Sequence, residues 1–255
     1  MHHRTQHIID LVVVLTHKEM KVRYKNNVLG YLWSIVHPLA FAFVFFVAFK
    51  VVMRIDMENY TLFLIAGLFP WQWFSNSVMA APTVFLNNAS IIKKVNFPRS
   101  VVMLAAVLQD AIHYILSIPV IVLFLFIFHQ RPSLSWLWGI PMLMAIQFLM
   151  TYGVSLLISS INLFFRDLER LTGIIITFMF YLTPIIYPET MIPENYRDLI
   201  NLNPLSPLMI SWRKLFLEGT IDPLSIMTSF VYALVAAAVG HMVYKRLVWK
   251  FAEVL

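Results

Sequence analysis

The chain has 255 residues, enough for one or two soluble domains, but its composition excludes a soluble protein. Apolar types make up 60% and charged types 13%, against about one quarter charged in ordinary globular chains; with a mean hydropathy of +0.77, this indicates an integral membrane protein. The net charge of +6 is scattered in short clusters, which excludes a nucleic-acid-binding patch, and the lack of cysteine excludes disulfides.

The N-terminal segment 5–25 predicts an amphipathic helix that lies in the cytoplasmic membrane interface. Four apolar side chains recur at helical spacing, and basic residues follow them. These apolar residues are Ile8, Leu11, Val12 and Leu15. The stretch is too short for a signal peptide, contains Asp10, and is not followed by a small-residue cleavage site.

Six apolar runs are each close to the length of about 20 residues that a helix needs to cross a bilayer. They cover residues 31–53, 60–83, 101–128, 135–161, 171–187 and 224–244. The fifth run is short and ends between Pro184 and Pro188. The pattern therefore predicts an all-α membrane protein in which residues 1–255 form a single domain with six transmembrane helices.

The basic residues predict which side of the membrane each connection faces. Thirteen of the 19 Lys and Arg residues lie at the two termini and in the connections after the second and fourth runs. The other side has six basic and seven acidic residues. By the positive-inside rule, both termini lie in the cytoplasm.

Two connections carry further information. Residues 84–100 form a short polar and basic connection on the cytoplasmic side. Residues 188–223 form the long outer connection, but its middle, 199–217, is too apolar for a free loop and too short to cross the membrane twice. We expect it to be a re-entrant pair of half-helices, sheltered by protein or by a cavity.

The sequence carries no energy-converting motif. None of its seven glycines precedes a lysine, so there is no phosphate-binding loop, and a transporter of this kind uses an ion gradient or an ATPase on another chain. Asp110 and His113 share a helix face and could form a proton relay. We favour the alternative that Asp110 pairs with His113 or with a neighbouring helix and fixes packing. No third ligand or nucleophile accompanies them, so no metal site and no catalytic residue is predicted.

Aromatic side chains suggest a path for a ligand. Phe41, Phe45 and Phe49 follow one another at four-residue spacing, and Tyr181 and Tyr187 flank the proline turn that ends the fifth run. Sugar rings stack on aromatic faces, and a conduit must bind weakly at many places. These five rings are candidates for a channel wall, although such a stripe is also typical of plain helix packing. A belt at the membrane surfaces is predicted for Tyr60, Trp71, Trp73, Trp136, Trp138 and Tyr187.

Five sequence blocks carry a family resemblance. They are KVRYKNNVLGYLWSIVHPLA (21–40), FLIAGLFPWQWF (63–74), NASIIKKVNFPRS (88–100), FYLTPIIYP (180–188) and NPLSPLMISWRKLFLEG (203–219). In this order the blocks resemble ABC-type polysaccharide export permeases, which serve O-antigen, capsule and teichoic acid transport. The chain looks most like the O-antigen exporters, which move a lipid-linked glycan, and the resemblance spans nearly its whole length.

The resemblance implies a homodimer of permeases on two cytoplasmic ABC ATPase subunits, in the bacterial inner membrane. A continuous channel along the dimer interface would carry lipid-linked polysaccharide. ATP and Mg would bind to the partner ATPase, and this chain would hold no cofactor. Membrane lipid, and not nucleic acid, would surround it.

The resemblance also implies roles for three sets of residues. A segment that couples the chain to the ATPase would comprise Asn88, Ser90, Ile91, Lys93, Lys94 and Phe97. Lys93 and Lys94 equally fit the role of positive-inside anchors. Lipid headgroups, or a pyrophosphate-linked lipid, would meet Lys21, Arg23 and Lys25 of the interface helix. The outer gate would contain Asn203, Pro204, Pro207 and Arg213, mainly in structural roles.

Three other functions stay open. An ABC permease for a lipid or drug would have a closed lateral pocket instead of a ring-lined passage. A gradient-driven carrier would depend on Asp110 and His113. An enzyme acting on lipid-linked sugar is disfavoured, because no pair of carboxylates stands at a membrane face with the spacing that glycosyl chemistry uses.

Overall fold

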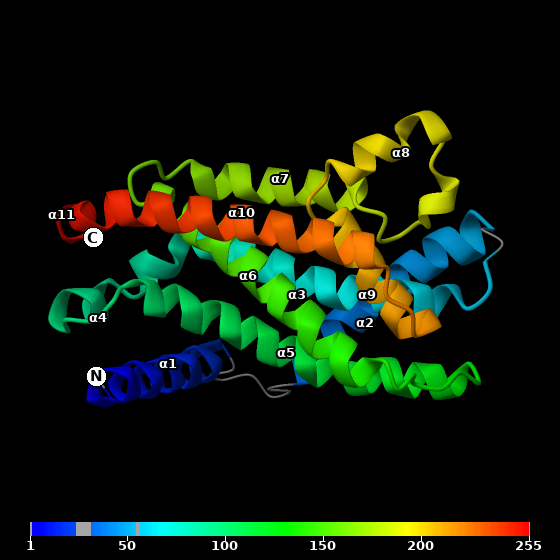
Figure 1. The fold of residues 1–255 in the computed structure, drawn as a ribbon, viewed down its shortest axis with the longest axis horizontal. Coiled ribbons are helices and arrows are strands. Elements are labelled where there is room, and N and C mark those ends of the chain that lie inside the picture. Colours follow the sequence, from blue (N-terminus) through cyan, green and yellow to red (C-terminus); the bar gives the residue numbers. More distant parts are fainter. Residues whose placement is uncertain (1, 24–31, 55–56, 255) are drawn as a thin grey trace.

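The computed structural model of the chain describes residues 2–23, 32–54 and 57–254, and every regular element in these ranges is helical. Figure 1 shows the elements in chain order: α1 (His2–Arg23), α2 (Trp33–Phe45), the π-helical η2 (Phe46–Val52), α3 (Tyr60–Asn87), α4 (Ala89–Lys94), α5 (Ser100–Ile127), α6 (Trp136–Asn162), α7 (Leu168–Leu182), η3 (Glu189–Met191), α8 (Glu194–Asn201), α9 (Ser206–Glu218), α10 (Pro223–Leu247), η4 (Val248–Lys250) and α11 (Phe251–Val254). The all-α prediction is confirmed.

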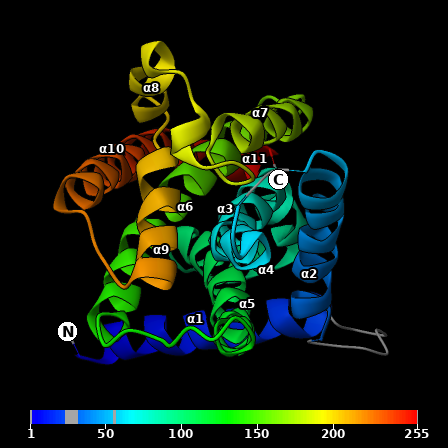
Figure 2. The same ribbon diagram turned by 90° about the vertical axis from the view of Figure 1, so that its right-hand side faces the viewer.

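Helix α3 lies at the centre of the bundle, as the view along the bundle in Figure 2 shows. It contacts α2, α5, α6, α7 and α9. Every side chain from Leu62 to Trp71 is buried. The helix also contains Pro70 and Pro82, each of which removes one internal hydrogen bond of the helix.

The amide of Gln147 joins three helices in the core. Its Nε2 donates to the Pro70 carbonyl of α3 at 2.7 Å, and its Oε1 accepts from the Trp212 indole of α9. The Asn162 amide, also on α6, donates to the Pro82 carbonyl at 2.9 Å. Because a buried polar group without a partner is strongly unfavourable, these bonds hold α3, α6 and α9 in register.

Three of the described helices are long and apolar enough to cross a membrane: Ser100–Ile127, Trp136–Asn162 and Pro223–Lys250. A further apolar stretch, Leu39–Val52, is shorter. Helix α3 has 28 residues, as many as α5, but more of its side chains are polar, and α7 has 15 residues. The helices are those of a membrane protein, while the count of six spans stays a prediction.

Helix α1 lies across one edge of the bundle, along the lower side of Figure 2, and packs on α5. Leu15 is buried in this contact, together with three partly buried residues of the predicted apolar face: Ile8, Leu11 and Val12. The opposite face is exposed and mixed, with Ile9, Val13 and Val14 beside Asp10 and His17. A helix with one face packed on protein and a mixed outer face fits the membrane interface, and its place there remains a prediction.

The central position of α3 overturns part of the predicted aromatic belt. Tyr60, Trp71 and Trp73 are at most 4% exposed and lie inside the protein. The prediction that these three rings face the membrane surface is wrong, because other helices enclose α3. Trp136 is buried as well, whereas Trp138 is exposed.

The segment between α7 and α10 contains the 3-10 turn η3 and two short α-helices, and the second α-helix enters the core. Helix α8 stands out at one end of the molecule, whereas α9 packs against α3, α6 and α10 (Figure 1). Leu208, Trp212 and Leu215 of α9 are fully buried. Helix α9 is therefore buried, as the apolar character of 199–217 indicates, whereas the described side chains of α8 are mostly exposed, and re-entry into the membrane stays a prediction.

Helix α10 begins at a capped turn. The Asp222 carboxylate accepts hydrogen bonds from the backbone N–H groups of Leu224 and Ser225 and from the Ser225 hydroxyl. The Ser225 hydroxyl, with the two backbone groups, holds the pKa of Asp222 below its usual range. A carboxylate that stays ionised at a helix N-terminus stabilises the helix.

Helices α6 and α10 cross where two glycines meet. A Cβ atom on Gly240 would collide with the carbonyl oxygen of Gly153, and one on Gly153 would lie 2.5 Å from the backbone carbonyl carbon of Ala236. Small residues that allow two backbones to approach are typical of helix pairs in membranes.

We expect Gly240→Ala to push α10 away from α6 and to lower the free energy of unfolding by about 2 kcal/mol, because the added methyl group meets rigid backbone. The midpoint of thermal unfolding of the purified chain in detergent measures this. Gly173→Ala is the matched control, since a Cβ at Gly173 has nothing within 4 Å. Equal midpoints for Gly240→Ala and the parent chain would contradict the close crossing.

Candidate functional site

The candidate site is a row of aromatic rings shared by α2 and α7, which both lie beside α3 (Figure 2). The ring centroid of Phe45 lies 6.3 Å from that of Phe41 and 6.2 Å from that of Phe49. It also lies 5.5 Å from Phe180 of α7, which in turn packs on Tyr181 at 5.3 Å. The two predicted groups of rings therefore meet through Phe180, a residue that the sequence spacing did not single out.

The five candidate rings differ in how far they face outward. Phe41 and Tyr181 are 47% and 56% exposed, whereas Phe45 and Phe49 are partly buried against the core. The Tyr187 hydroxyl donates to the Tyr181 carbonyl at 2.8 Å, so it stabilises the turn that follows α7. Phe41 and Tyr181 thus offer the largest ring surface to a ligand.

The turn after α7 is tied to two other helices through its carbonyl groups. The Tyr60 hydroxyl of α3 donates to the Ile186 carbonyl at 2.7 Å. Arg213 of α9 donates from Nη2 to the Ile185 carbonyl at 2.8 Å. Both carbonyls belong to buried residues, so the turn is a fixed part of the bundle.

The guanidinium of Arg213 is buried against an aromatic ring. The residue is 8% exposed, and its Cζ lies 3.6 Å from the centroid of Phe63. A Cβ atom on Gly67 would lie 2.8 Å from Nη2, so this glycine leaves the space that the guanidinium occupies. A buried cation needs such partners, and here they tie α9 to α3.

The other residues assigned to the outer gate lie where α9 begins. The Asn203 amide accepts a hydrogen bond from the Leu205 backbone N–H at 3.0 Å and donates to the Thr183 hydroxyl at 2.9 Å. Pro207 lies in the first turn of α9, where a backbone N–H would have no acceptor within the helix. Pro204 precedes the helix and is half-buried. These are structural contacts, and motion of a gate stays a prediction.

Helix α4 forms a tip between α3 and α5, at the end of the molecule where both termini lie (Figure 1). Three residues of the predicted coupling segment are exposed there: Ser90, Lys93 and Lys94. Ile91 and Phe97 are half-buried, and Ile92 is buried beneath them. A basic surface over an apolar anchor is suited to contact with another protein, and the coupling role stays a prediction.

Asn88 differs from the rest of the coupling segment, because its side chain is turned inward. It is 3% exposed, and its Nδ2 donates to the Val84 carbonyl at 3.0 Å while its Oδ1 accepts from Lys18 of α1. Both ends of the amide are used within the chain. Asn88 therefore ties α1 to the junction of α3 and α4.

Of the basic residues predicted to meet lipid headgroups, Lys21 is exposed on α1. Arg23 ends α1, but its side chain is not among the described ones, and Lys25 lies outside the described residues. The headgroup role of these residues remains a prediction.

Asp110 is buried in α5 and bonded to α3. It is 6% exposed, and its Oδ2 accepts from the Ser77 hydroxyl at 2.7 Å. This bond agrees with the packing interpretation of Asp110. Within the ranges 2–23, 32–54 and 57–254, no three His, Asp or Glu side chains form a group that could hold a metal ion.

Comparison with known proteins gives consistent matches along the chain. Residues 10–217 match the ABC-2 type transporter family. The chain is 48% identical to an O-antigen export system permease protein RfbA of Klebsiella pneumoniae over 255 residues. The alignment covers 100% of this chain and 98% of the relative. It is 31% identical over 236 residues to RfbA of Myxococcus xanthus, over 89% of both chains. It is 21% identical over 232 residues to the polysialic acid transport protein KpsM of Escherichia coli, over 89% and 90% of the two chains.

We expect Arg213→Met to lower the free energy of unfolding by about 2–3 kcal/mol, because it leaves the buried Ile185 carbonyl without its donor. Thermal unfolding in detergent measures the loss, and Arg213→Lys should recover only part of it, since Lys lacks the planar fork. Lys214→Met is the control. Lys214 is partly exposed, and its ion pair with Glu189 is long, at 3.8 Å, and therefore weak. If the two Met variants have the same unfolding midpoint, the hydrogen bond from Arg213 to the Ile185 carbonyl does not stabilise the fold.

Proposed function

The chain belongs to the ABC-2 type transporter family, and from this we propose that it is the membrane subunit of an ATP-driven exporter of lipid-linked polysaccharide. The observation that carries the proposal is the 48% identity, along the whole chain, to an O-antigen export permease. O-antigen is accordingly the cargo that we propose, and the bacterial inner membrane is the location. The chain is a permease and not an enzyme, as its relatives are.

The energy source in this proposal is a separate ABC ATPase, the normal partner of permeases of this family. The sequence supports this, because none of its seven glycines precedes a lysine as a phosphate-binding loop requires. Two ATPase subunits would bind ATP and Mg. The exposed residues Ser90, Lys93 and Lys94 of α4 would contact them.

The arrangement of the helices supports the proposed orientation. Both termini and α4 lie at one end of the molecule, and α8 lies toward the other (Figure 1). With the basic residues concentrated at the termini and around α4, that end would face the cytoplasm. Six segments would cross the membrane: α2 with η2, α3, α5, α6, α7 and α10.

We propose that a second copy of the chain lies against α2 and α7. The centre of one bundle is filled by α3 and leaves no room there for a glycan, so a passage has to run between bundles. Helices α2 and α7 expose large apolar side chains, among them Phe43, Val44, Ile175 and Phe178. A passage on this side of both copies would carry Phe41 and Tyr181 on its walls.

The function is tested by deleting the gene for this chain in a bacterial strain that makes the glycan proposed as cargo. We expect the glycan to disappear from the cell surface and its lipid-linked form to accumulate inside, with both effects reversed by a plasmid copy. The purified chain alone should hydrolyse no ATP, because it lacks a phosphate-binding loop. Surface glycan that persists in the deletion strain, or ATP turnover by the chain alone, would contradict the proposal.

The double substitution Phe45→Ala with Tyr181→Ala should slow export about tenfold, because two ring contacts together contribute about 1.4 kcal/mol. The rate at which surface glycan appears after precursor is supplied measures this, and the unfolding midpoint checks the fold. Phe126→Ala is the control, since Phe126 of α5 is 57% exposed and lies off the aromatic row. Equal export rates in the two variants would rule out a sugar-facing row.

A further inference from the structure

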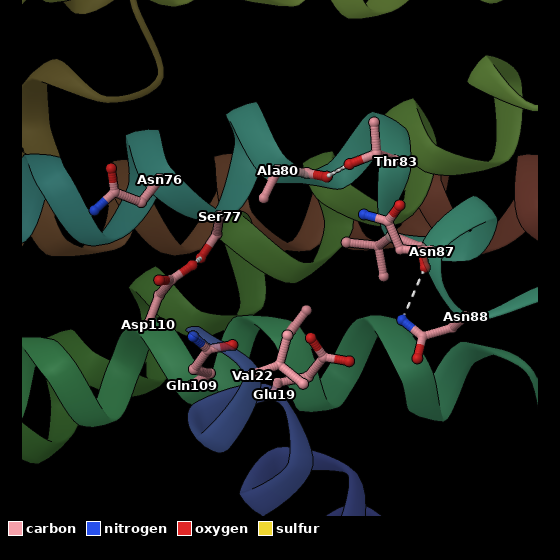
Figure 3. A pocket seen from close by; sticks show the side chains of 12 residues that line it. Glu19, Val22, Asn76, Ser77, Ala80, Thr83, Asn87, Asn88, Gln109 and Asp110 are labelled. Carbon is pink, nitrogen blue, oxygen red and sulfur yellow. Dashed lines mark hydrogen bonds between the residues drawn. The ribbon is translucent and has the colours of Figure 1, made fainter. Parts of the chain in front are cut away.

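A polar cleft lies between α1, α3 and α5, and Figure 3 shows the side chains that line it. Its volume is about 220 Å³. The lining includes Glu19 of α1, Asn76 and Thr83 of α3, and Gln109 and Asp110 of α5. The cleft is separate from the aromatic row, and no sequence motif pointed to it.

One face of α3 is polar along the half of the helix that borders the cleft. Asn76, Ala80, Thr83 and Asn87 follow one another at spacings of four, three and four residues, which places them on one face. Three of them are exposed and Thr83 is half-buried, whereas the stretch 62–71 is buried throughout. An amide that faces hydrocarbon without a partner is strongly unfavourable, so this face must meet water or a polar ligand.

Two hydrogen bonds fix the walls of the cleft. The Ser77 hydroxyl donates to Asp110 at 2.7 Å and joins α3 to α5. Lys18 of α1 donates to Asn88, which lies where α3 passes into α4. The cleft is therefore held open between elements that are tied together at two points, and a ligand would enter a largely pre-formed site.

The lining is suited to hydroxyl groups. Glu19 and Asp110 are acidic, and the described residues that line the cleft include no Lys or Arg. The nearby ammonium of Lys18 is already engaged by Glu19 at 3.2 Å and by Asn88, so a phosphate group is disfavoured. The side-chain amides of Asn76 and Asn87 make no hydrogen bond to the other residues drawn in Figure 3, so they can both donate and accept. An uncharged ligand rich in hydroxyl groups satisfies carboxylates and amides together.

The size of the cleft suits one sugar ring. A water molecule in the liquid takes about 30 Å³, so the cleft has room for about seven waters. Drug-sized ligands occupy pockets of about 300 Å³ or more. A monosaccharide unit is the hydroxyl-rich ligand that fits the smaller space.

We propose that this polar cleft binds one sugar unit of the cargo, at the end of the bundle where Lys18 of α1 bonds Asn88. The proposal rests on the proposed function, because the ligand class comes from polysaccharide export. Sugar hydroxyls donate to the carboxylates of Glu19 and Asp110, and the amides of Asn76 and Asn87 bond the remaining oxygens. The aromatic row then takes the sugars that follow.

The absence of cysteine from the chain permits a labelling experiment without background. Ala80→Cys places a thiol on the wall of the cleft, and Trp249→Cys places one outside it, on a residue that is 84% exposed near the C-terminal end. Inside-out membrane vesicles, with the partner ATPase present, are treated with a charged methanethiosulfonate reagent. One set of vesicles comes from cells that make the lipid-linked glycan, and the other from cells blocked in its synthesis.

We expect Ala80→Cys to react readily in the glycan-free vesicles and about tenfold more slowly when glycan is present, which corresponds to ~90% occupancy. Trp249→Cys should react at the same rate in both. The proposal is overturned if Ala80→Cys does not react without glycan, or if glycan leaves its rate unchanged. If surface glycan is lost in the deletion strain but labelling is independent of glycan, only the cleft fails; if surface glycan persists there, the proposed function fails.

A matched pair of double variants gives an independent measurement. Asn76→Leu with Thr83→Val removes the polar groups at similar volume, whereas Asn76→Gln with Thr83→Ser keeps them. We expect the apolar double variant to slow export about tenfold and the polar double variant to export at close to the parent rate. The unfolding midpoints of the two should be similar. Equal export rates for the two double variants would overturn the proposal. If these side chains had only a structural role, variants of equal stability would export at equal rates.

Discussion

The packing of α3 against α6 and α9 depends on hydrogen bonds between polar groups that are buried in an apolar bundle. Gln147 makes two of these bonds, because its amide binds the Pro70 carbonyl of α3 and the Trp212 indole of α9. Asn162 does the same for the Pro82 carbonyl. Through these bonds, the long helix with two prolines and many polar side chains can stand at the centre, and its neighbours are held around it.

The two halves of α3 meet different surroundings. At its start, Tyr60 and Arg213 hold the turn after α7 by its carbonyl groups, and that end is closed. At its other end, the face from Asn76 to Asn87 borders a polar cleft. In an exporter of the proposed kind, a sugar unit would bind in this cleft before the cargo enters the passage between the two copies.

The side chains that fit the proposed cargo are suited to contact and not to catalysis. Rings such as Phe41 and Tyr181 and amides such as Asn76 bind sugars through stacking and hydrogen bonds that exchange quickly, which is what a long polymer in transit requires. Asp110, the acidic residue at membrane depth, is bonded to Ser77 between two helices. Permeases of this family normally work with an ABC ATPase, and in the proposed exporter that partner would supply the work on the cargo, through a surface such as that of α4.

The sequence by itself determined that the chain is an all-helical membrane protein, that residues 199–217 do not form a free loop, and which family its five blocks belong to. Only the tertiary structure decided that Tyr60 and Trp71 lie inside, that Asn88 turns inward, that Phe180 joins the two groups of rings, and that a polar cleft borders α3. The reason is physical. Spacing shows how apolar each face of a helix is, but lipid and protein interior are equally apolar, so the pattern cannot tell which of them covers that face.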